Sequence, residues 1–267
     1  MNIIDIHTHV YPEKIVDAAG KSIAGFYDVE LAHRGAVGEL LEANERAGVT
    51  RCVVFSTATK ASQVPSIDRF IIGLCREYPQ FTGLGTMYPG FEAVEEELEL
   101  LLEHGIHGIK LHPDCQGFNA DDPVMTPVYR EIARRGMFIL FHSGDPRHGC
   151  SHPDRIARVA RAFPEMPVIA AHCGGWMQWA EARHAFAGME NVWYDTSSTF
   201  GFGGNDPFFR ALDAFGADRL MFGSDFPMWD AETEARRLLS LGLSDGENEG
   251  ILHGNFERFE QMIAARL

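Results

Sequence analysis

Two histidines one residue apart, His7 and His9, are the first candidates for chemistry in this chain. They stand in the segment Asp5-Ile6-His7-Thr8-His9, at the end of the first apolar run. Side chains alternate along a β-strand, so a strand here places both imidazoles on the same side. Two imidazoles at that spacing can bind one metal ion. The pair predicts a metal-dependent enzyme whose site is anchored at the end of its first strand.

Polar residues also follow several later apolar runs. His142 and Asp225 follow two of them, and with the first pair they make a set of three nitrogens and one carboxylate. That set suits Zn²⁺, or a similar divalent ion such as Mn²⁺, Fe²⁺ or Co²⁺. An open coordination position would hold a water, whose pKa a metal can lower to about 7.

Further residues at these ends have less specific roles. His172 is either a metal ligand or a general base and electrostatic partner of the bound water. Lys110 and His112 share one strand face and are candidates for substrate binding. Arg147, after the fifth run, is a candidate to bind an anion, as a guanidinium does well. Asp195 is interpreted as a loop cap.

These side chains need a scaffold, and short apolar runs supply its strands. Most runs are nearly continuous in apolar residues, as expected of parallel strands buried on both faces. From the third run onward their spacing is about that of one βα unit. The first gap is longer, which predicts extra structure around Tyr11–Arg34. The eight runs are Ile3–Ile6, Cys52–Phe55, Phe81–Met87, Gly108–Leu111, Met137–Phe141, Val168–Ala171, Asn191–Tyr194 and Leu220–Phe222.

The intervening segments predict helices. Glycines at their ends, prolines in their first turns and leucines at helical spacing indicate these helices. Repeated βα units with right-handed crossovers close into an eight-stranded barrel, and residues 1–267 suit one domain. An open doubly wound sheet is the alternative, but no GxGxxG follows the first strand. The predicted helices are Gly35–Gly48, Phe91–Gly105, Pro153–Phe163, Asp206–Phe215 and Glu247–Leu267.

Composition limits the partners and the location. The chain has 23 basic and 38 acidic residues, a net charge of −15, so we expect no nucleic acid partner. No segment is apolar for long enough to span a membrane, and the start does not resemble a signal peptide. The five scattered cysteines are expected to be reduced thiols in a cytoplasmic protein.

The ordered motifs resemble the amidohydrolase superfamily. Within it they resemble the amidohydrolase-2 family, which includes aminocarboxymuconate-semialdehyde decarboxylase-like enzymes. The match runs nearly end to end and in the right order. The motifs are DIHTH at 5–9, GIKLHPD at 108–114, FHSG at 141–144, AHCGG at 171–175, GSDFP at 223–227 and ILHGNFERF at 251–259.

The resemblance implies a distorted (β/α)8 barrel with a divalent metal, usually one Zn²⁺. It assigns the ligand positions to His7, His9, His142 and Asp225. His172 matches a histidine that contacts the metal-bound water in decarboxylase-like members. Lys110 falls on the strand that carries a bridging lysine in binuclear members, but a mononuclear site is favoured. A homodimer is an expectation of the family alone.

Three reactions remain open, because one activated water serves all of them. The first is hydrolysis of an amide, ester or lactone in a small carboxylate-bearing molecule, with Asp225 moving the proton and His172 stabilising negative charge. The second is non-oxidative decarboxylation, and hydration of a double bond is the third. A non-catalytic metal-binding module is the alternative of another class. A TatD-type nuclease also begins with HxH, but the acidic charge counts against it.

Overall fold

Eight parallel strands form a barrel in the computed structural model, which describes residues 2–267. β3 and β4 are the two halves of one predicted strand, interrupted at Leu84, whose N–H donates to the Val54 carbonyl at 3.0 Å. The strands are β1 (Ile4–His9), β2 (Arg51–Phe55), β3 (Phe81–Gly83), β4 (Gly85–Thr86), β5 (Gly108–Leu111), β6 (Phe138–Phe141), β7 (Val168–Ala170), β8 (Val192–Asp195) and β9 (Leu220–Met221).

The barrel closes because β1 also pairs with the segment that follows β9. The Ile6 N–H donates to the Phe222 carbonyl at 3.0 Å, and the His9 N–H donates to the Phe226 carbonyl at 2.7 Å. Thr8 and Phe226 form a parallel bridge. The first strand is therefore joined to the last, and the predicted (β/α)8 barrel is confirmed.

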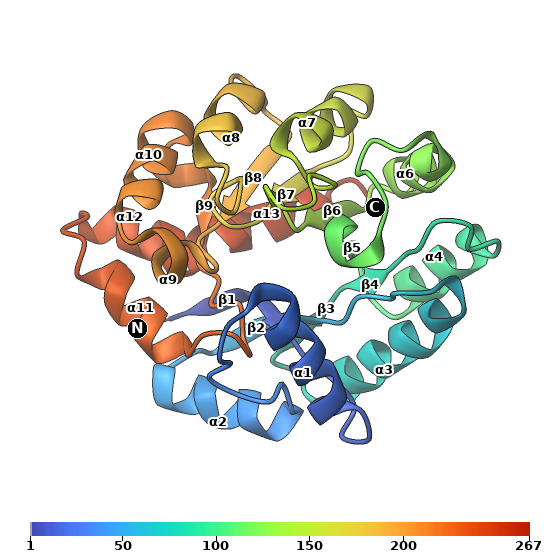
Figure 1. Ribbon diagram of the computed structural model, residues 1–267, viewed down its shortest axis with the longest axis horizontal. Helices are drawn as coiled ribbons and strands as arrows, with labels where there is room; N and C mark the ends of the chain where they lie inside the picture. Colours follow the sequence, from blue (N-terminus) through green and yellow to red (C-terminus); the bar gives the residue numbers. More distant parts are fainter. Residues whose placement is uncertain (1) are drawn as a thin grey trace.

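Helices surround the strands (Figure 1). Four predicted helices are present as α2 (Val37–Ala47), α4 (Val94–Glu103), α7 (Pro153–Ala162) and α10 (Asp206–Phe215). The extra structure predicted after the first strand contains α1 (Val16–Tyr27), and the final helix is divided into α12 (Asp245–Glu249), a π-helical turn (Gly250–Gly254) and α13 (Asn255–Ala264). The others are α3 (Val64–Glu77), α5 (Pro113–Gln116), α6 (Thr126–Arg134), α8 (Trp179–Ala185), α9 (Thr199–Gly203) and α11 (Ala231–Leu239). Among the described residues, no helix is both long and apolar enough to cross a membrane.

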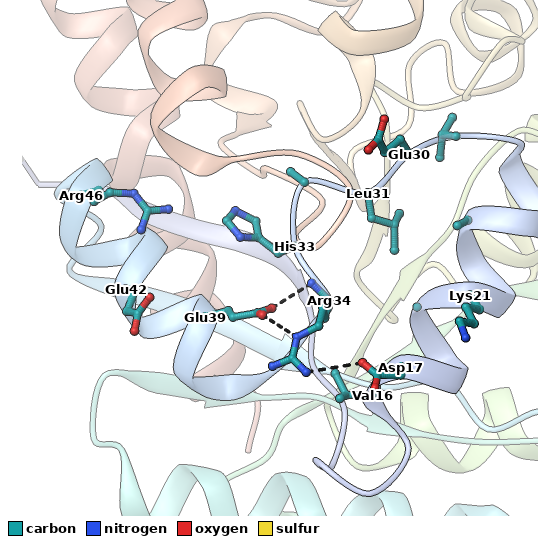
Figure 2. Close-up of a pocket in the computed structure, with 14 residues that line it drawn as sticks. Val16, Asp17, Lys21, Glu30, Leu31, His33, Arg34, Glu39, Glu42 and Arg46 are labelled. Atoms are coloured by element: carbon teal, nitrogen blue, oxygen red, sulfur yellow. Dashed lines mark hydrogen bonds and ion pairs between the residues drawn. The ribbon is translucent and has the colours of Figure 1, made fainter.

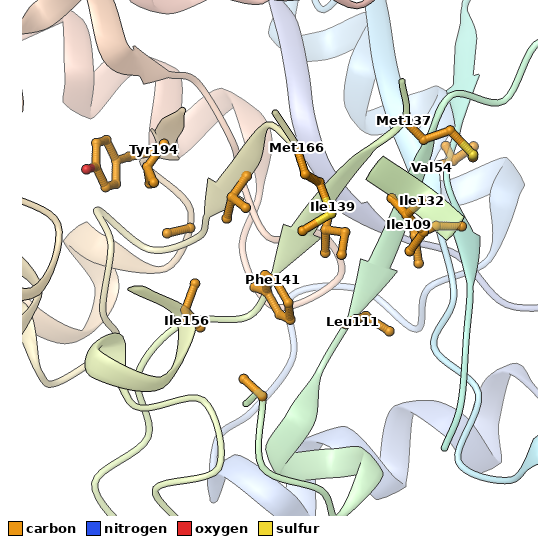
Figure 3. Packing of buried hydrophobic residues seen from close by; sticks show 14 of the residues in the cluster. Val54, Ile109, Leu111, Ile132, Met137, Ile139, Phe141, Ile156, Met166 and Tyr194 are labelled. Atoms are coloured by element: carbon orange, nitrogen blue, oxygen red, sulfur yellow. The ribbon is translucent and has the colours of Figure 1, made fainter. Parts of the chain in front are cut away.

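Two apolar layers fix which way each strand residue points. Ile109 and Leu111 of β5 pack outward with Ile139 and Phe141 of β6, in the layer between strands and helices (Figure 3). A second cluster, which includes Leu140, fills the inside of the barrel. Lys110 stands between two outward residues, so alternation turns its side chain inward.

An irregularity in β1 sets the direction of its histidines. Asp5 pairs with Cys52 and Thr8 pairs with Val54, so β1 carries one extra residue across this step. Such a β-bulge resets the alternation of a strand. Ile6 belongs to the inner cluster, and His7 nevertheless lines the cavity at the end of the barrel.

The loops after β6 and β7 interlock at Gly144, which has a φ of +82°. A Cβ there would lie 2.5 Å from the backbone nitrogen of Trp176. We expect Gly144→Ala to lower the free energy of unfolding by about 1–3 kcal/mol or more, measured by urea denaturation. The control Gly73→Ala, in α3 with nothing within 4 Å of the added Cβ, should raise it by about 0.5–1 kcal/mol. An unchanged midpoint for Gly144→Ala would contradict the interlock.

Candidate metal centre

The predicted strand-end residues meet at one small cavity. It has a volume of about 20 Å³ and lies at the carboxyl end of the barrel, where barrel enzymes keep their sites. Most of its walls come from the strand ends, and α1 contributes the rest. The lining residues are His7, His9, Tyr11, Ile23, Tyr27, His112, His142, His172, Asp225, Pro227 and Met228.

His7 presents one nitrogen lone pair to this cavity. Its Nδ1 lies 2.8 Å from Asp195 Oδ2, and a carboxylate can only accept, so Nδ1 carries the proton. Its Nε2 is therefore an acceptor. That atom receives a hydrogen bond from Lys110 Nζ at 3.1 Å and lies 3.3 Å from Asp225 Oδ1.

His142 and His172 face each other with two more lone pairs. His142 Nε2 donates to the Gly144 carbonyl at 2.9 Å, and His172 Nδ1 donates to the Ser197 carbonyl at 3.0 Å. Both carbonyls must accept, which fixes the neutral tautomers. The remaining atoms, His142 Nδ1 and His172 Nε2, are 2.9 Å apart. In neutral imidazoles no proton lies between them, so this contact favours a shared cation.

Asp225 adds a carboxylate to these nitrogens. Its Oδ1 lies 3.5 Å from His9 Nε2, and its Oδ2 accepts from Ser198 Oγ at 2.5 Å. Asp225 has a φ of 67° and His172 has a φ of 62°. Non-glycine residues in this left-handed region cost roughly 1–3 kcal/mol each, and such strain clusters at functional sites.

Burial keeps the imidazoles neutral. It lowers the pKa of His7, His9 and His142, and it lowers the pKa of His172 to about 4. Burial also lowers the pKa of Lys110 to about 8. Neutral imidazole is the form that binds metals.

The donor set fits a divalent cation. Ligand atoms of His7, His172 and Asp225 lie within 4.8 Å of one another. Two nitrogens and one carboxylate oxygen without protons thus converge in a buried place, where a positive charge offsets their mutual repulsion. This grouping includes His172, whose role the sequence left open.

The structure gives His142 and its neighbours additional partners. Ligand atoms of His112, Asp114 and His142 form a second close group. Asp114 already accepts from the Cys150 N–H at 2.9 Å and from Ser151 Oγ, so it supports a loop. The assignment of His142 as a ligand stays a prediction.

The three predicted substrate-binding residues are placed differently from one another. Lys110 contacts His7, as described, and His112 lines the cavity with its ring stacked 3.9 Å from that of His142. Arg147 is absent from the residues that line the cavity. Its guanidinium donates to Asp145 Oδ2 at 2.7 Å and to the Phe26 carbonyl at 2.6 Å.

Asp195 and Tyr27 are the functional candidates that sequence reasoning undervalued. Asp195 does cap its loop, because Oδ1 accepts from the Ser197 N–H at 3.0 Å, but its other oxygen orients His7. Its position at the end of β8, on the shared face of the barrel, was the available signal. Tyr27 comes from α1, and its hydroxyl lies 2.6 Å from His112 Nε2. No motif marks it in the sequence.

Comparison with known sequences finds a family that matches nearly the whole chain. Residues 4–259 match the sequence model of the family described as amidohydrolase, of the amidohydrolase-2 type. A region of 200 residues is 28% identical to the uncharacterized protein y4mH of Sinorhizobium fredii, and it covers 63% of this chain and 64% of that protein. That match spans less than two thirds of the relative's length.

Three solved structures share the fold. The TIM-barrel protein Bb4693 of Bordetella bronchiseptica has a TM-score of 0.80 at 21% identity, covering 99% of this chain and 100% of that one. The 5-carboxyvanillate decarboxylase LigW of Sphingomonas paucimobilis has a TM-score of 0.76 at 15% identity, covering 97% and 99%. A dihydroxybenzoic acid decarboxylase of Polaromonas sp. JS666, with bound manganese and the inhibitor 2-nitroresorcinol, has a TM-score of 0.73 at 15% identity, covering 100% and 98%. At these identities the likeness shows the fold.

Removing the first two histidines tests the metal centre. The double variant His7→Ala, His9→Ala should lose bound Mn²⁺ or Zn²⁺, because two of the nitrogens that face the cavity disappear. Metal content per chain, measured by plasma mass spectrometry after dialysis, gives the result. His184→Ala removes an exposed histidine of α8 and should keep the wild-type content. Full occupancy in the double variant would refute the assignment.

Asp195 should act on the metal through His7. Asp195→Asn can donate as well as accept, so it no longer fixes the proton on His7 Nδ1. We expect a metal affinity weaker by about 10–100-fold, as for other residues that orient a ligand histidine. Competition with a fluorescent chelator measures it. An unchanged affinity in a folded Asp195→Asn protein would show that the contact only supports the loop.

Proposed function

We propose, because this chain belongs to the amidohydrolase family, that it is an enzyme that removes CO2 from a small, flat carboxylic acid with the help of a divalent metal. One observation carries the proposal: a buried group of unprotonated ligand atoms faces a cavity walled by rings. Tyr11, Tyr27 and His112 form part of that wall. Flat rings pack well against such walls, which also exclude water.

Decarboxylation needs the carboxylate held, and it needs one proton. A bound divalent metal would supply positive charge for the carboxylate and for the negative charge that develops as CO2 leaves. His7, Asp225 and His172 are the residues that would hold it, together with the predicted ligands His9 and His142. Lys110, fully buried behind His7, adds positive charge at the same end of the cavity.

Asp225 is the residue that would move the proton. It is the carboxylate among the residues that line the cavity. When the bond between the ring carbon and CO2 breaks, the electron pair stays on that carbon. Asp225 Oδ1 would first take the proton of the acid's carboxyl group and would then deliver it to that carbon, so that the acid is converted into the decarboxylated product and CO2 with no net gain or loss of a proton. The decarboxylase neighbours, one with manganese, support this reaction and favour Mn²⁺ beside Zn²⁺ as the metal.

Hydrolysis of an amide, ester or lactone is the second candidate. The proximity of His172 Nε2 to Asp225 favours it, because both atoms can take a proton from a water in the cavity. Decarboxylation consumes no water, whereas hydrolysis needs room for water beside the substrate. The decarboxylase neighbours make decarboxylation the first candidate.

Product analysis separates the two reactions. The Mn²⁺-loaded protein should release CO2 from at least one hydroxybenzoate in a panel, as measured by mass spectrometry of dissolved gas. Asp225→Asn should lower kcat per bound metal by about 10²–10⁴-fold, because the proton donor is lost. The exposed Asp206→Asn on α10 is the matched control. Cleavage of esters or lactones without CO2 from any acid would instead establish the hydrolase.

A further inference from the structure

The cavity at the metal centre is too small for any substrate of the proposed class. Its volume of about 20 Å³ has room for about one water molecule. An aromatic acid occupies several times that space. If the proposed function holds, part of the wall must move before the substrate enters.

Most of the wall is fixed by the barrel, but Ile23 and Tyr27 come from α1. In Figure 1, α1 lies in front of the strands near β2 and β3. Only Val16 and Gly20 of its twelve residues are buried, and no side chain caps its N-terminus. At its other end, Asp28 takes a left-handed φ of 55°. α1 is therefore held by few contacts, and its end is a natural place for a hinge.

Open space also lies beside this helix. A groove of about 710 Å³ separates α1 and the 29–34 segment from α2 (Figure 2). Small α1 residues, Gly20 and Ala24, line it. Arg34 bridges Asp17 at 3.4 Å and Glu39 at 2.8 Å, so the first turns of α1 are tied down. The α1 residues that line the groove end at Ala24, so this space borders the helix up to the turn that carries Tyr27.

Arg147 fastens the last turns of α1 to the barrel. It follows β6, and its guanidinium donates to the Phe26 carbonyl at 2.6 Å. The guanidinium carbon lies 4.9 Å from the ring centre of Phe26, 5.2 Å from that of Tyr27 and 4.9 Å from that of Trp176. Asp145 holds the other side of the guanidinium. Cation–π contacts of this kind contribute about 0.5–2 kcal/mol each.

We propose that α1 is a gate over the metal centre, fastened by Arg147, and that its closure places the Tyr27 hydroxyl on the substrate. In the closed state without substrate, that hydroxyl is hydrogen-bonded to His112 Nε2. With substrate bound, it donates to a carboxylate or hydroxyl oxygen of the acid instead. Tyr27 is then a substrate-binding residue, and Arg147 is a positioning residue that acts through α1.

Hydrogen–deuterium exchange of the full chain tests the gate without substrate or metal. Arg147→Met keeps the length of the side chain but removes the guanidinium contacts. Amides of residues 20–27 should then exchange about tenfold faster, while those of α2 and α7 stay unchanged. Arg158→Met, which removes an exposed arginine of α7 paired with Asp121, should match the wild type. Unchanged exchange of 20–27 in Arg147→Met overturns the proposal, and a role of Arg147 in direct anion binding would give that result.

Ligand binding tests the role of Tyr27. With 2-nitroresorcinol as the probe on the Mn²⁺-loaded protein, exchange of residues 20–27 should slow. Tyr27→Phe should bind the probe about tenfold more weakly by calorimetry, with unchanged metal content. Equal affinity in Tyr27→Phe would overturn the contact. Failure of the wild type to bind the probe would count against the proposed substrate class, and the Arg147→Met comparison would still decide the gate.

Discussion

The extra residue in β1 is the constraint on which the site depends. Without it, strict alternation would turn His7 away from the barrel whenever Ile6 points inward. With it, the strand supplies apolar side chains to the core and imidazoles to the cavity. Ligand candidates from other strands lie at the same place, and His7 joins them because its side chain points inward. A local change in register thus converts a structural strand into one that can also bind a metal.

Around that strand, one carboxylate and two backbone carbonyls accept hydrogen bonds from the imidazole N–H groups. The Asp195 carboxylate accepts from His7, the Ser197 carbonyl accepts from His172, and the Gly144 carbonyl accepts from His142. Each ring is left with a lone pair turned inward. The site is therefore defined as much by the acceptors behind the histidines as by the histidines themselves, because those acceptors decide which nitrogen is free.

Much of this architecture can be predicted from the sequence. The rest cannot, because it depends on contacts between residues that are far apart in the chain. The strands could be located in advance from apolar runs that are nearly continuous, and the histidine pair from the alternation of side chains along a strand. The bulge cannot be, because it depends on pairing with β2. The double role of Asp195 depends on a ring from β1, which is distant in sequence. Tyr27 arrives on a helix whose place over the cavity no local pattern encodes.

The joining of β1 to the segment after β9 has a consequence for the order of folding. His7 lies in the first strand and Asp225 follows the last one, so the contact between them has a very large sequence separation. Contacts of this kind form slowly, because a long loop must close first. The ion site cannot be complete in a nascent chain until the final strand has been added. A metal ion that binds at that point would stabilise the closed barrel by mass action, because it contacts both the first strand and the segment after the last one.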